Sequence, residues 1–200
     1  MTITARTTLV LGGSRSGKSA VAERLLAGRP DVTYVATGPV PDGADLDWAA
    51  RVERHRARRP QGWVTRETTD LAEVLGATDG ALLVDSVGSW LTGVLDDCGA
   101  WADAPGWRAT CADRLDQLQA AWLRAPGPVV AVSDEVGSGV VPATASGRLF
   151  RDLLGELNAR LSLAADRVLL VVAGRVLELS HPDVLLGVPS TVAPFPLEAP

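Results

Sequence analysis

The sequence predicts an α/β fold in a single domain, with a mostly parallel β-sheet that is flanked by helices. Short runs rich in Val and Leu, which suit strands buried on both faces, alternate along the chain with longer segments. In the longer segments apolar residues recur every three or four positions, as they do in amphipathic helices. Strands separated by helices need crossover connections, which produce a parallel sheet. The 200 residues, 46% of them hydrophobic, suffice for one sizeable core.

Short apolar runs predict the strands. They are TTLVL (7–11), VTYVAT (32–37), ALLVD (81–85), PVVAVS (128–133) and RVLLVV (167–172). Because Val and Leu dominate these runs, we expect helices to cover both faces of the sheet. Gly174 breaks the last run, so residues 175–178 can return as an antiparallel edge strand.

The helices are predicted between these runs, at residues 17–27, 45–58, 86–96, 107–124 and 144–165. Turn-forming and acidic residues in DDCGAWADAPG (96–106) predict an exposed loop between two of the helices. The folded domain is expected to span residues 1–179. The proline-rich tail, 180–200, is expected to lie along the surface or to fray.

Composition limits the class of partner. The net charge is −5 and the pI about 5.0, whereas binding to nucleic acid or to an anionic membrane needs a basic field. We therefore expect small-molecule partners and no nucleic acid. Cys98 and Cys111 are too few for a disulfide framework and lack the spacing of a zinc site. The start does not resemble a signal peptide and no run approaches ~20 apolar residues, so a cytoplasmic location without a membrane span is expected.

The stretch GGSRSGKS matches the phosphate-binding loop, or P-loop: a glycine, four residues, then Gly-Lys-Ser, between an apolar strand and an amphipathic helix. The glycines let successive backbone N–H groups face phosphate oxygens at the positive end of the helix. The alternative is a glycine-rich turn that only caps a helix. The residues expected to bind nucleotide are Gly12, Gly13, Ser14, Arg15, Ser16, Gly17, Lys18 and Ser19.

Lys18 is the only lysine in a chain that otherwise uses arginine for its strong cations. A narrow loop needs a compact ammonium on a flexible stem, and guanidinium is a broad planar fork. We expect Lys18 to be catalytic and to reach the β- and γ-phosphates, and Ser19 to bind a Mg²⁺ ion that bridges them. Asp85, at the end of a buried strand, is a second expected magnesium ligand. Its competing role is to cap the next helix, which Ser86 could do instead.

His55 lies in the cationic stretch RVERHRARRP. On a helix, Arg51, Arg58 and Arg59 lie about one turn from it and share its face. Such a face suits a bound polyanion, and the neighbouring cations disfavour imidazolium, which leaves a neutral ring nitrogen able to attack phosphorus. The alternative is structural, because arginines near the end of a helix complement its dipole.

Several motifs together resemble one enzyme family. GGSRSGKS (12–19), YVATG (34–38), the histidine and arginines before Trp63, DEVGSGVVP (134–142) and the segment 148–174 occur in a matching order and spacing. They resemble the bifunctional adenosylcobinamide kinase / adenosylcobinamide-phosphate guanylyltransferase family of cobalamin biosynthesis. The resemblance covers about residues 7–179. The P-loop is widespread, whereas the histidine segment and DEVGSGVVP are much more specific.

The resemblance implies two reactions. A nucleoside triphosphate, ATP or GTP, first phosphorylates the hydroxyl of the aminopropanol side chain of adenosylcobinamide. GMP from GTP is then attached to a histidine, which matches His55, and is passed to the phosphorylated corrinoid. The resemblance also implies a fold of the RecA type and a homotrimer.

Two features depart from the family pattern, which usually has asparagine where this chain has Asp134 and a different form of the segment SVGSW (86–90) after Asp85. Three roles stay open for Asp134 and Glu135: capping the following helix, binding metal through water, and contacting base or ribose. Two other functions also stay open, a P-loop small-molecule kinase without guanylyl transfer and a nucleotide-dependent switch. The switch lacks its usual guanine-reading sequence, Asn-Lys-x-Asp, because Lys18 is the only lysine.

Overall fold

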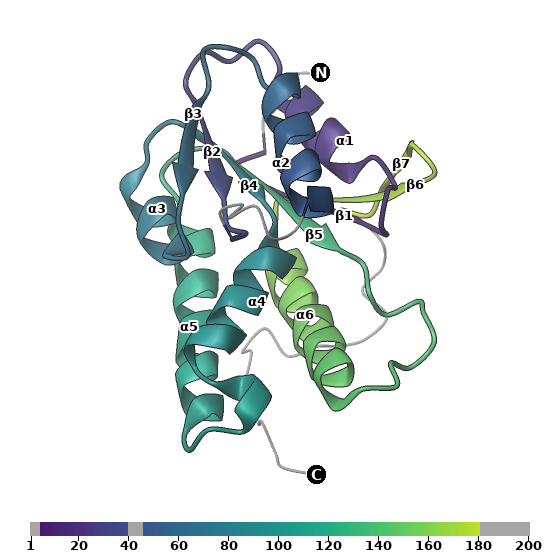
Figure 1. Ribbon diagram of the computed structural model, residues 1–200. Coiled ribbons are helices and arrows are strands. Elements are labelled where there is room, and N and C mark those ends of the chain that lie inside the picture. The colour runs from purple at the N-terminus through teal and green to yellow at the C-terminus, as the bar shows by residue number, and fades with distance from the viewer. Residues whose placement is uncertain (1–4, 40–45, 181–200) are drawn as a thin grey trace.

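The structure is a computed structural model that describes residues 5–39 and 46–180. Its centre is a seven-stranded sheet with the order β3-β2-β4-β5-β1-β6-β7 (Figure 1). Neighbouring strands are parallel except for β6 and β7, which form the antiparallel edge that the sequence predicts. The strands are β1 (Thr7–Gly12), β2 (Val32–Ala36), β3 (Val64–Glu67), β4 (Ala81–Asp85), β5 (Val129–Asp134), β6 (Arg167–Val172) and β7 (Arg175–Glu178).

Helices cover both faces of this sheet, with α1 and α2 on one side and α3, α4, α5 and α6 on the other (Figure 1). The predicted class, a mostly parallel α/β fold flanked by helices, is confirmed. Within the described part of the chain, none of the helices combines the length and apolar character needed to cross a bilayer. The helices are α1 (Lys18–Leu25), α2 (Leu46–Arg58), α3 (Leu71–Ala77), α4 (Val87–Asp97), η1 (Ala100–Ala102), α5 (Trp107–Arg124) and α6 (Ala145–Leu163).

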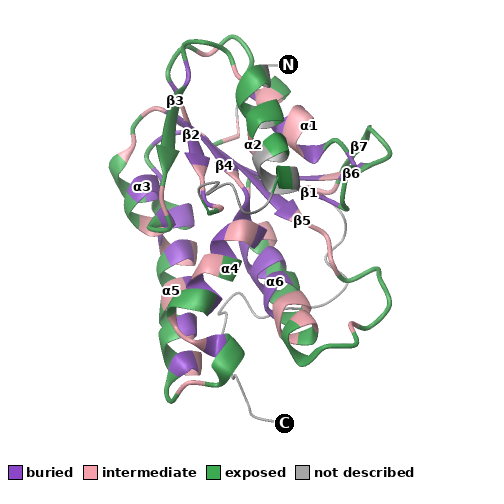
Figure 2. Cartoon of the chain, viewed as in Figure 1, coloured by how far each residue is buried: buried purple, intermediate pink, exposed green. Residues whose placement is uncertain are grey.

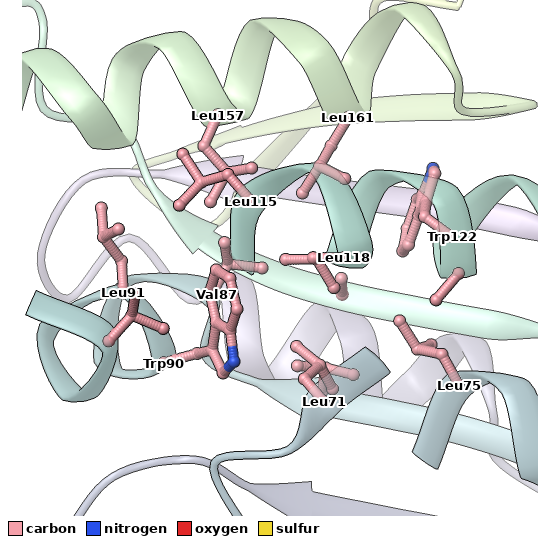
Figure 3. Packing of buried hydrophobic residues seen from close by; sticks show 14 of the residues in the cluster. Leu71, Leu75, Val87, Trp90, Leu91, Leu115, Leu118, Trp122, Leu157 and Leu161 are labelled. Carbon is pink, nitrogen blue, oxygen red and sulfur yellow. The ribbon is translucent and has the colours of Figure 1, made fainter. Parts of the chain in front are cut away.

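The larger hydrophobic core lies between the sheet and helices α3 to α6. Trp90 and Trp122, each 1% exposed, pack there among leucines from all four helices (Figure 3). A smaller core lies under α1, where Val21 and Leu26 pack against Val10 and Leu83 of the sheet. Burying each such side chain contributes about 1.5–3 kcal/mol, so the α3–α6 side contributes most of the hydrophobic stabilisation.

Two elements were not predicted from the sequence. All four residues of β3 are exposed (Figure 2), so this edge strand has no apolar run. Helix α3 has only seven residues, too few for its periodicity to stand out. A local signal for α3 existed, because the Asp70 side chain accepts a hydrogen bond from the Glu73 N–H as an N-cap.

The expectation of an exposed loop at residues 96–106 is wrong in part. Helix α4 continues to Asp97, and the short helix η1 follows, with Ala100 only 5% exposed. The Trp107 indole is buried and its Nε1 donates to Asp103 Oδ1 at 2.8 Å. Trp101 stays 40% exposed and its Nε1 donates to Asp96 Oδ1. Ala100 and the following Trp107 are packed into the core, whereas Trp101 and Ala102 stay exposed, so only part of this stretch is buried.

The strand register brings three carboxyl ends to one edge of the sheet. Gly12 at the end of β1 lies opposite Asp134 at the end of β5. On β4, Asp85 lies opposite Val132 of β5 and Ala36 of β2. Ligands bind at this edge in open parallel sheets, so the P-loop and both carboxylates lie where a site is expected.

Candidate functional site

The P-loop joins β1 to α1 in a backbone conformation that requires glycine. Gly17 has φ 98°, in the left-handed region, just before the helix begins at Lys18. A Cβ on Gly12 would lie 2.5 Å from Ser16 Oγ and 2.7 Å from the Val171 carbonyl oxygen. The Ser16 N–H donates to the Gly13 oxygen at 3.2 Å, which closes the loop on itself. The loop therefore has the compact backbone that the motif predicts.

The Ser16 hydroxyl is a second feature of this loop. Its Oγ is buried and makes no hydrogen bond to the described residues, while the Ser16 carbonyl oxygen accepts from the Gly174 N–H at 2.9 Å. Ser14 and Arg15, the two residues before it, are exposed at the mouth of the loop. A buried hydroxyl without a partner is costly unless a ligand satisfies it, so this atom is suited to a phosphate oxygen.

Lys18 is buried, and its ammonium is held by two oxygens. Lys18 Nζ lies 2.6 Å from Asp134 Oδ1 and donates to the Gly13 carbonyl oxygen at 3.2 Å. This pairing with Asp134 was not among the roles considered from the sequence. The strand register was the missing information, because it places Asp134 directly beside the start of the P-loop. The capping role left open for Asp134 is filled by Thr144, whose Oγ1 accepts from the Gly147 N–H at 3.1 Å.

Asp85 ends β4 with its carboxylate held by a tyrosine. The Tyr34 hydroxyl donates to Asp85 Oδ2 at 2.6 Å. The competing role, capping α4, belongs to Ser86, whose Oγ accepts from the Ser89 N–H at 3.2 Å. Thr37 fixes the same turn, because its Oγ1 donates to the Ser86 carbonyl oxygen at 2.6 Å and accepts from the Ser86 N–H at 3.2 Å. Asp85 is thus oriented at the site edge rather than used as a cap.

Glu135 is turned toward its own loop. Its Oε1 accepts from the Gly137 N–H at 3.0 Å, and its Oε2 accepts from the Ser138 N–H at 3.4 Å. The Glu135 N–H donates to the Gly12 carbonyl oxygen at 3.0 Å, which ties the start of the loop after β5 to the P-loop. These contacts give Glu135 a role in shaping the loop after β5.

Helix α2 carries the predicted nucleophile on the α1 side of the sheet (Figure 1). Arg51, His55 and Arg58 lie on it at helical spacing, and their side chains are outside the described part of the structure. Arg59, directly after the helix, is described: its Cζ lies 3.3 Å from the centroid of the Tyr34 ring. The structure therefore brings one of the predicted arginines against the tyrosine that holds Asp85.

The side-chain donors available for a metal are oxygens. Asp85 offers a carboxylate, and Ser19 in the first turn of α1 offers a hydroxyl. Among the side chains that the structure describes, no three His, Cys, Asp or Glu gather as a metal cluster. Mg²⁺ prefers hard oxygen ligands and is usually bound through one or two protein groups together with substrate phosphates and water. This donor set fits Mg²⁺ that arrives with a nucleotide.

A P-loop at the carboxyl edge of a mostly parallel sheet, with a buried lysine and a strand-end carboxylate, defines a P-loop nucleotide-binding protein of the α/β class. A solved structure of an ATPase from the type III secretion system of pathogenic bacteria has a similar fold, with a TM-score of 0.51 and 16% identity. The match covers 82% of this chain and 50% of that chain, and it bears on the fold alone.

Sequence comparison gives the particular family. Residues 8–179 match the family model described as cobinamide kinase / cobinamide phosphate guanyltransferase, and the chain belongs to this family. The bifunctional adenosylcobalamin biosynthesis protein CobU of Salmonella typhimurium is 39% identical over 180 residues, covering 83% of this chain and 95% of that protein. The protein named CobP in Pseudomonas aeruginosa is 39% identical over 171 residues, covering 83% and 92%. The resemblance inferred from the motifs is confirmed.

Proposed function

We propose that this chain carries out both reactions in the name of its family, with one P-loop serving both. It phosphorylates the aminopropanol hydroxyl of adenosylcobinamide and then transfers GMP from GTP to the product. The observation that carries the proposal is the buried Lys18 at the start of α1, paired with Asp134 at the end of β5, on the same sheet edge as Asp85. This arrangement supports triphosphate binding in a chain that matches the family along nearly all of its described length.

In the kinase step the chain positions a nucleoside triphosphate, ATP or GTP, and stabilises charge. The P-loop N–H groups and Lys18 bind the β- and γ-phosphates, and Ser16 supplies a further hydroxyl. Ser19 and Asp85 would hold Mg²⁺, which when bound neutralises negative charge on the phosphates. The corrinoid hydroxyl oxygen bonds to the γ-phosphorus as the bond from that phosphorus to the β-phosphate oxygen breaks. The hydroxyl proton passes to solvent, and the nucleoside diphosphate leaves. When the nucleotide binds, before this transfer, Lys18 exchanges the Asp134 carboxylate for phosphate oxygens.

In the second step His55 acts as a covalent nucleophile. A neutral ring nitrogen of His55 bonds to the α-phosphorus of GTP, and the bond to the bridging oxygen breaks to release pyrophosphate. The phosphate of the phosphorylated corrinoid then attacks the same phosphorus and regenerates the free imidazole. Arg51 and Arg58 neutralise the phosphate oxygens. Arg59 is committed to Tyr34 and to Thr65, whose Oγ1 accepts from its Nη1 at 2.9 Å, so we assign it a secondary role.

Labelled GTP separates this function from its alternatives. With GTP labelled at the α-phosphorus, we expect acid-labile label on the protein, and none on His55→Ala. With adenosylcobinamide and GTP labelled at the γ-phosphorus, His55→Ala should still form the labelled corrinoid phosphate. Kinase product without any protein adduct in the wild type would leave a plain small-molecule kinase. Slow hydrolysis that ignores the corrinoid would favour a nucleotide-dependent switch. The homotrimer stays a prediction that sedimentation equilibrium can test.

A further inference from the structure

A row of polar contacts runs across the sheet from its β3 edge to Asp85. Arg59 Nη1 donates to Thr65 Oγ1 at 2.9 Å, the Arg59 guanidinium lies over the Tyr34 ring, and the Tyr34 hydroxyl donates to Asp85 Oδ2. The register explains the alignment: Thr65 of β3 and Leu83 of β4 both lie opposite Tyr34 of β2. Asp85 follows Leu83 by two residues, so the Asp85 side chain lies on the same face of the sheet as those of Leu83 and Tyr34.

The Tyr34 hydroxyl donates a short hydrogen bond to Asp85. Tyr34 is only 2% exposed, so this contact lies at the margin of the core and not in open solvent. A bond of 2.6 Å between a hydroxyl and an ionised acceptor belongs to the strong, charge-assisted class.

Arg59 holds the ring from its other side. Its Cζ lies 3.3 Å from the ring centroid, in the geometry of a cation–π contact. The Arg59 Nε is buried without a hydrogen-bond partner among the described residues, so this guanidinium is held mainly by the ring and by Thr65. Tyr34 is thus enclosed between Arg59, directly after α2, and the small core under α1. Its hydroxyl donates to Asp85 Oδ2 at 2.6 Å.

We propose that Tyr34 is a positioning residue, which orients the Asp85 carboxylate for Mg²⁺ through its hydroxyl. Packing alone would need only the ring, and phenylalanine would serve equally well in that role. The hydroxyl adds a fixed donor that holds Oδ2 and so sets the direction in which the carboxylate presents its other oxygen. The inference rests on the proposed function, because it takes Asp85 to be a ligand of the nucleotide-bound metal.

The test compares nucleotide binding with and without Mg²⁺. The probe is a fluorescent GDP analogue, titrated against the full-length protein in excess Mg²⁺ and again in EDTA. The quantity of interest is the gain in affinity that Mg²⁺ adds. Tyr34→Phe removes one oxygen and keeps the ring, so we expect its affinity in EDTA to match the wild type and its Mg²⁺-dependent gain to fall about tenfold.

A matched control removes a buried hydroxyl elsewhere on the sheet. Thr8 on β1 is 1% exposed and its Oγ1 has no hydrogen-bond partner in the described structure. Thr8→Val keeps the side-chain shape, and we expect its affinities in Mg²⁺ and in EDTA to equal those of the wild type. Thermal melting of both variants confirms that each is folded at the assay temperature.

Asp85→Asn distinguishes the two levels of the proposal. If it keeps the full Mg²⁺-dependent gain, or if the wild type shows no gain, Asp85 is not a metal ligand and the magnesium part of the proposed function fails together with this inference. If Asp85→Asn loses the gain while Tyr34→Phe keeps it, only the positioning role of Tyr34 is overturned. A Tyr34→Phe variant that loses the same factor in Mg²⁺ and in EDTA overturns it as well, because that pattern reports a general disturbance of the site.

Discussion

The ion pair between Lys18 and Asp134 predicts that one substitution will lower the stability of the protein and raise its affinity for nucleotide. Asp134→Asn removes the negative charge and keeps the size of the side chain. The nucleotide-free protein loses the partner of a buried ammonium and should become less stable. Nucleotide binding should become tighter, because phosphates no longer compete with a carboxylate for Lys18. Asparagine has nearly the same size and shape as aspartate, so the variant is expected to fold.

The magnitude follows from the geometry of the pair. At the observed 2.6 Å the Coulomb attraction between unit charges is about 6 kcal/mol for an effective dielectric constant of about 20. The Asp134 side chain is 36% exposed, so solvent screening and the cost of desolvation offset most of this attraction. Lys18 also keeps the Gly13 carbonyl oxygen as an acceptor. We therefore expect a net loss of about 1–2 kcal/mol in the free energy of unfolding.

The free energy that is no longer needed to break the Lys18–Asp134 pair should strengthen nucleotide binding by the same amount. About 1.4 kcal/mol corresponds to tenfold in a dissociation constant, so Asp134→Asn should bind a non-hydrolysable GTP analogue about tenfold more tightly. Calorimetric titration measures the affinity, and urea unfolding without nucleotide measures the stability. Asp31→Asn is the control, because Asp31 forms an exposed pair with Arg29 just before β2, at the opposite end of that strand from the site. Weaker nucleotide binding by Asp134→Asn would refute the reasoning and indicate that Asp134 contacts the metal or the nucleotide.

Two further predictions concern the P-loop and the stability of the sheet. Lys18→Arg should fold but lose about 10²-fold in kcat/KM for corrinoid phosphorylation, because guanidinium does not fit a loop in which Lys18 is only 6% exposed. Turnover at the wild-type level would contradict this. At the start of β1, the backbone N–H of Thr7 donates to the Asp166 carboxylate, and so does that of Arg6. These hydrogen bonds, mainly the one from Thr7, lower the pKa of Asp166. A lowered pKa in the folded state means that this stabilisation is present above the unfolded pKa of about 3.9 and is lost as pH falls through the folded value. Asp166→Asn should therefore lower the free energy of unfolding by about 1 kcal/mol at pH 7, as measured by urea unfolding. The difference from the wild type should shrink below about pH 4. A difference that stays constant across pH would show that the Asp166 charge is not its cause.

The central strands and long helices could be predicted because their signals are local. An apolar run such as ALLVD identifies β4 without reference to the rest of the chain, and the structure has the strand at the same residues, Ala81–Asp85. Edge strand β3 carries no such signal, since VTRE is exposed at all four positions and is held by pairing with β2. The prediction for the stretch after α4 was wrong in part for a related reason. Its turn-forming residues indicate a loop, but the buried Trp107 that follows them anchors the segment through its hydrogen bond to Asp103.

For the site, too, the features with local sequence signals could be predicted and the contacts between distant residues could not. The P-loop is a contiguous motif, and its glycine in the left-handed region and its lysine follow from the sequence pattern alone. The contacts that complete it join residues far apart in the chain: Asp134 with Lys18, and Tyr34 with Asp85. Both pairs depend on which strands are neighbours and in what register, which the strand order β2-β4-β5-β1 determines. Composition and spacing carry no information on that order, so the partners could be found only from the fold.

The two faces of the sheet differ in role: one holds most of the hydrophobic core, and the other carries the charged groups of the site. The α3–α6 side holds the larger core, including the two most deeply buried tryptophans. On the α1 side the core is smaller, and charged groups are set directly into its margin: Lys18 at the start of α1, Asp85 at the end of β4, and Arg59 over Tyr34. Desolvated charges at such a margin cost stability, and only a well-packed opposite face can offset that cost. An acidic residue beside the P-loop lysine is consistent with this balance, because it neutralises the ammonium until a phosphate replaces it.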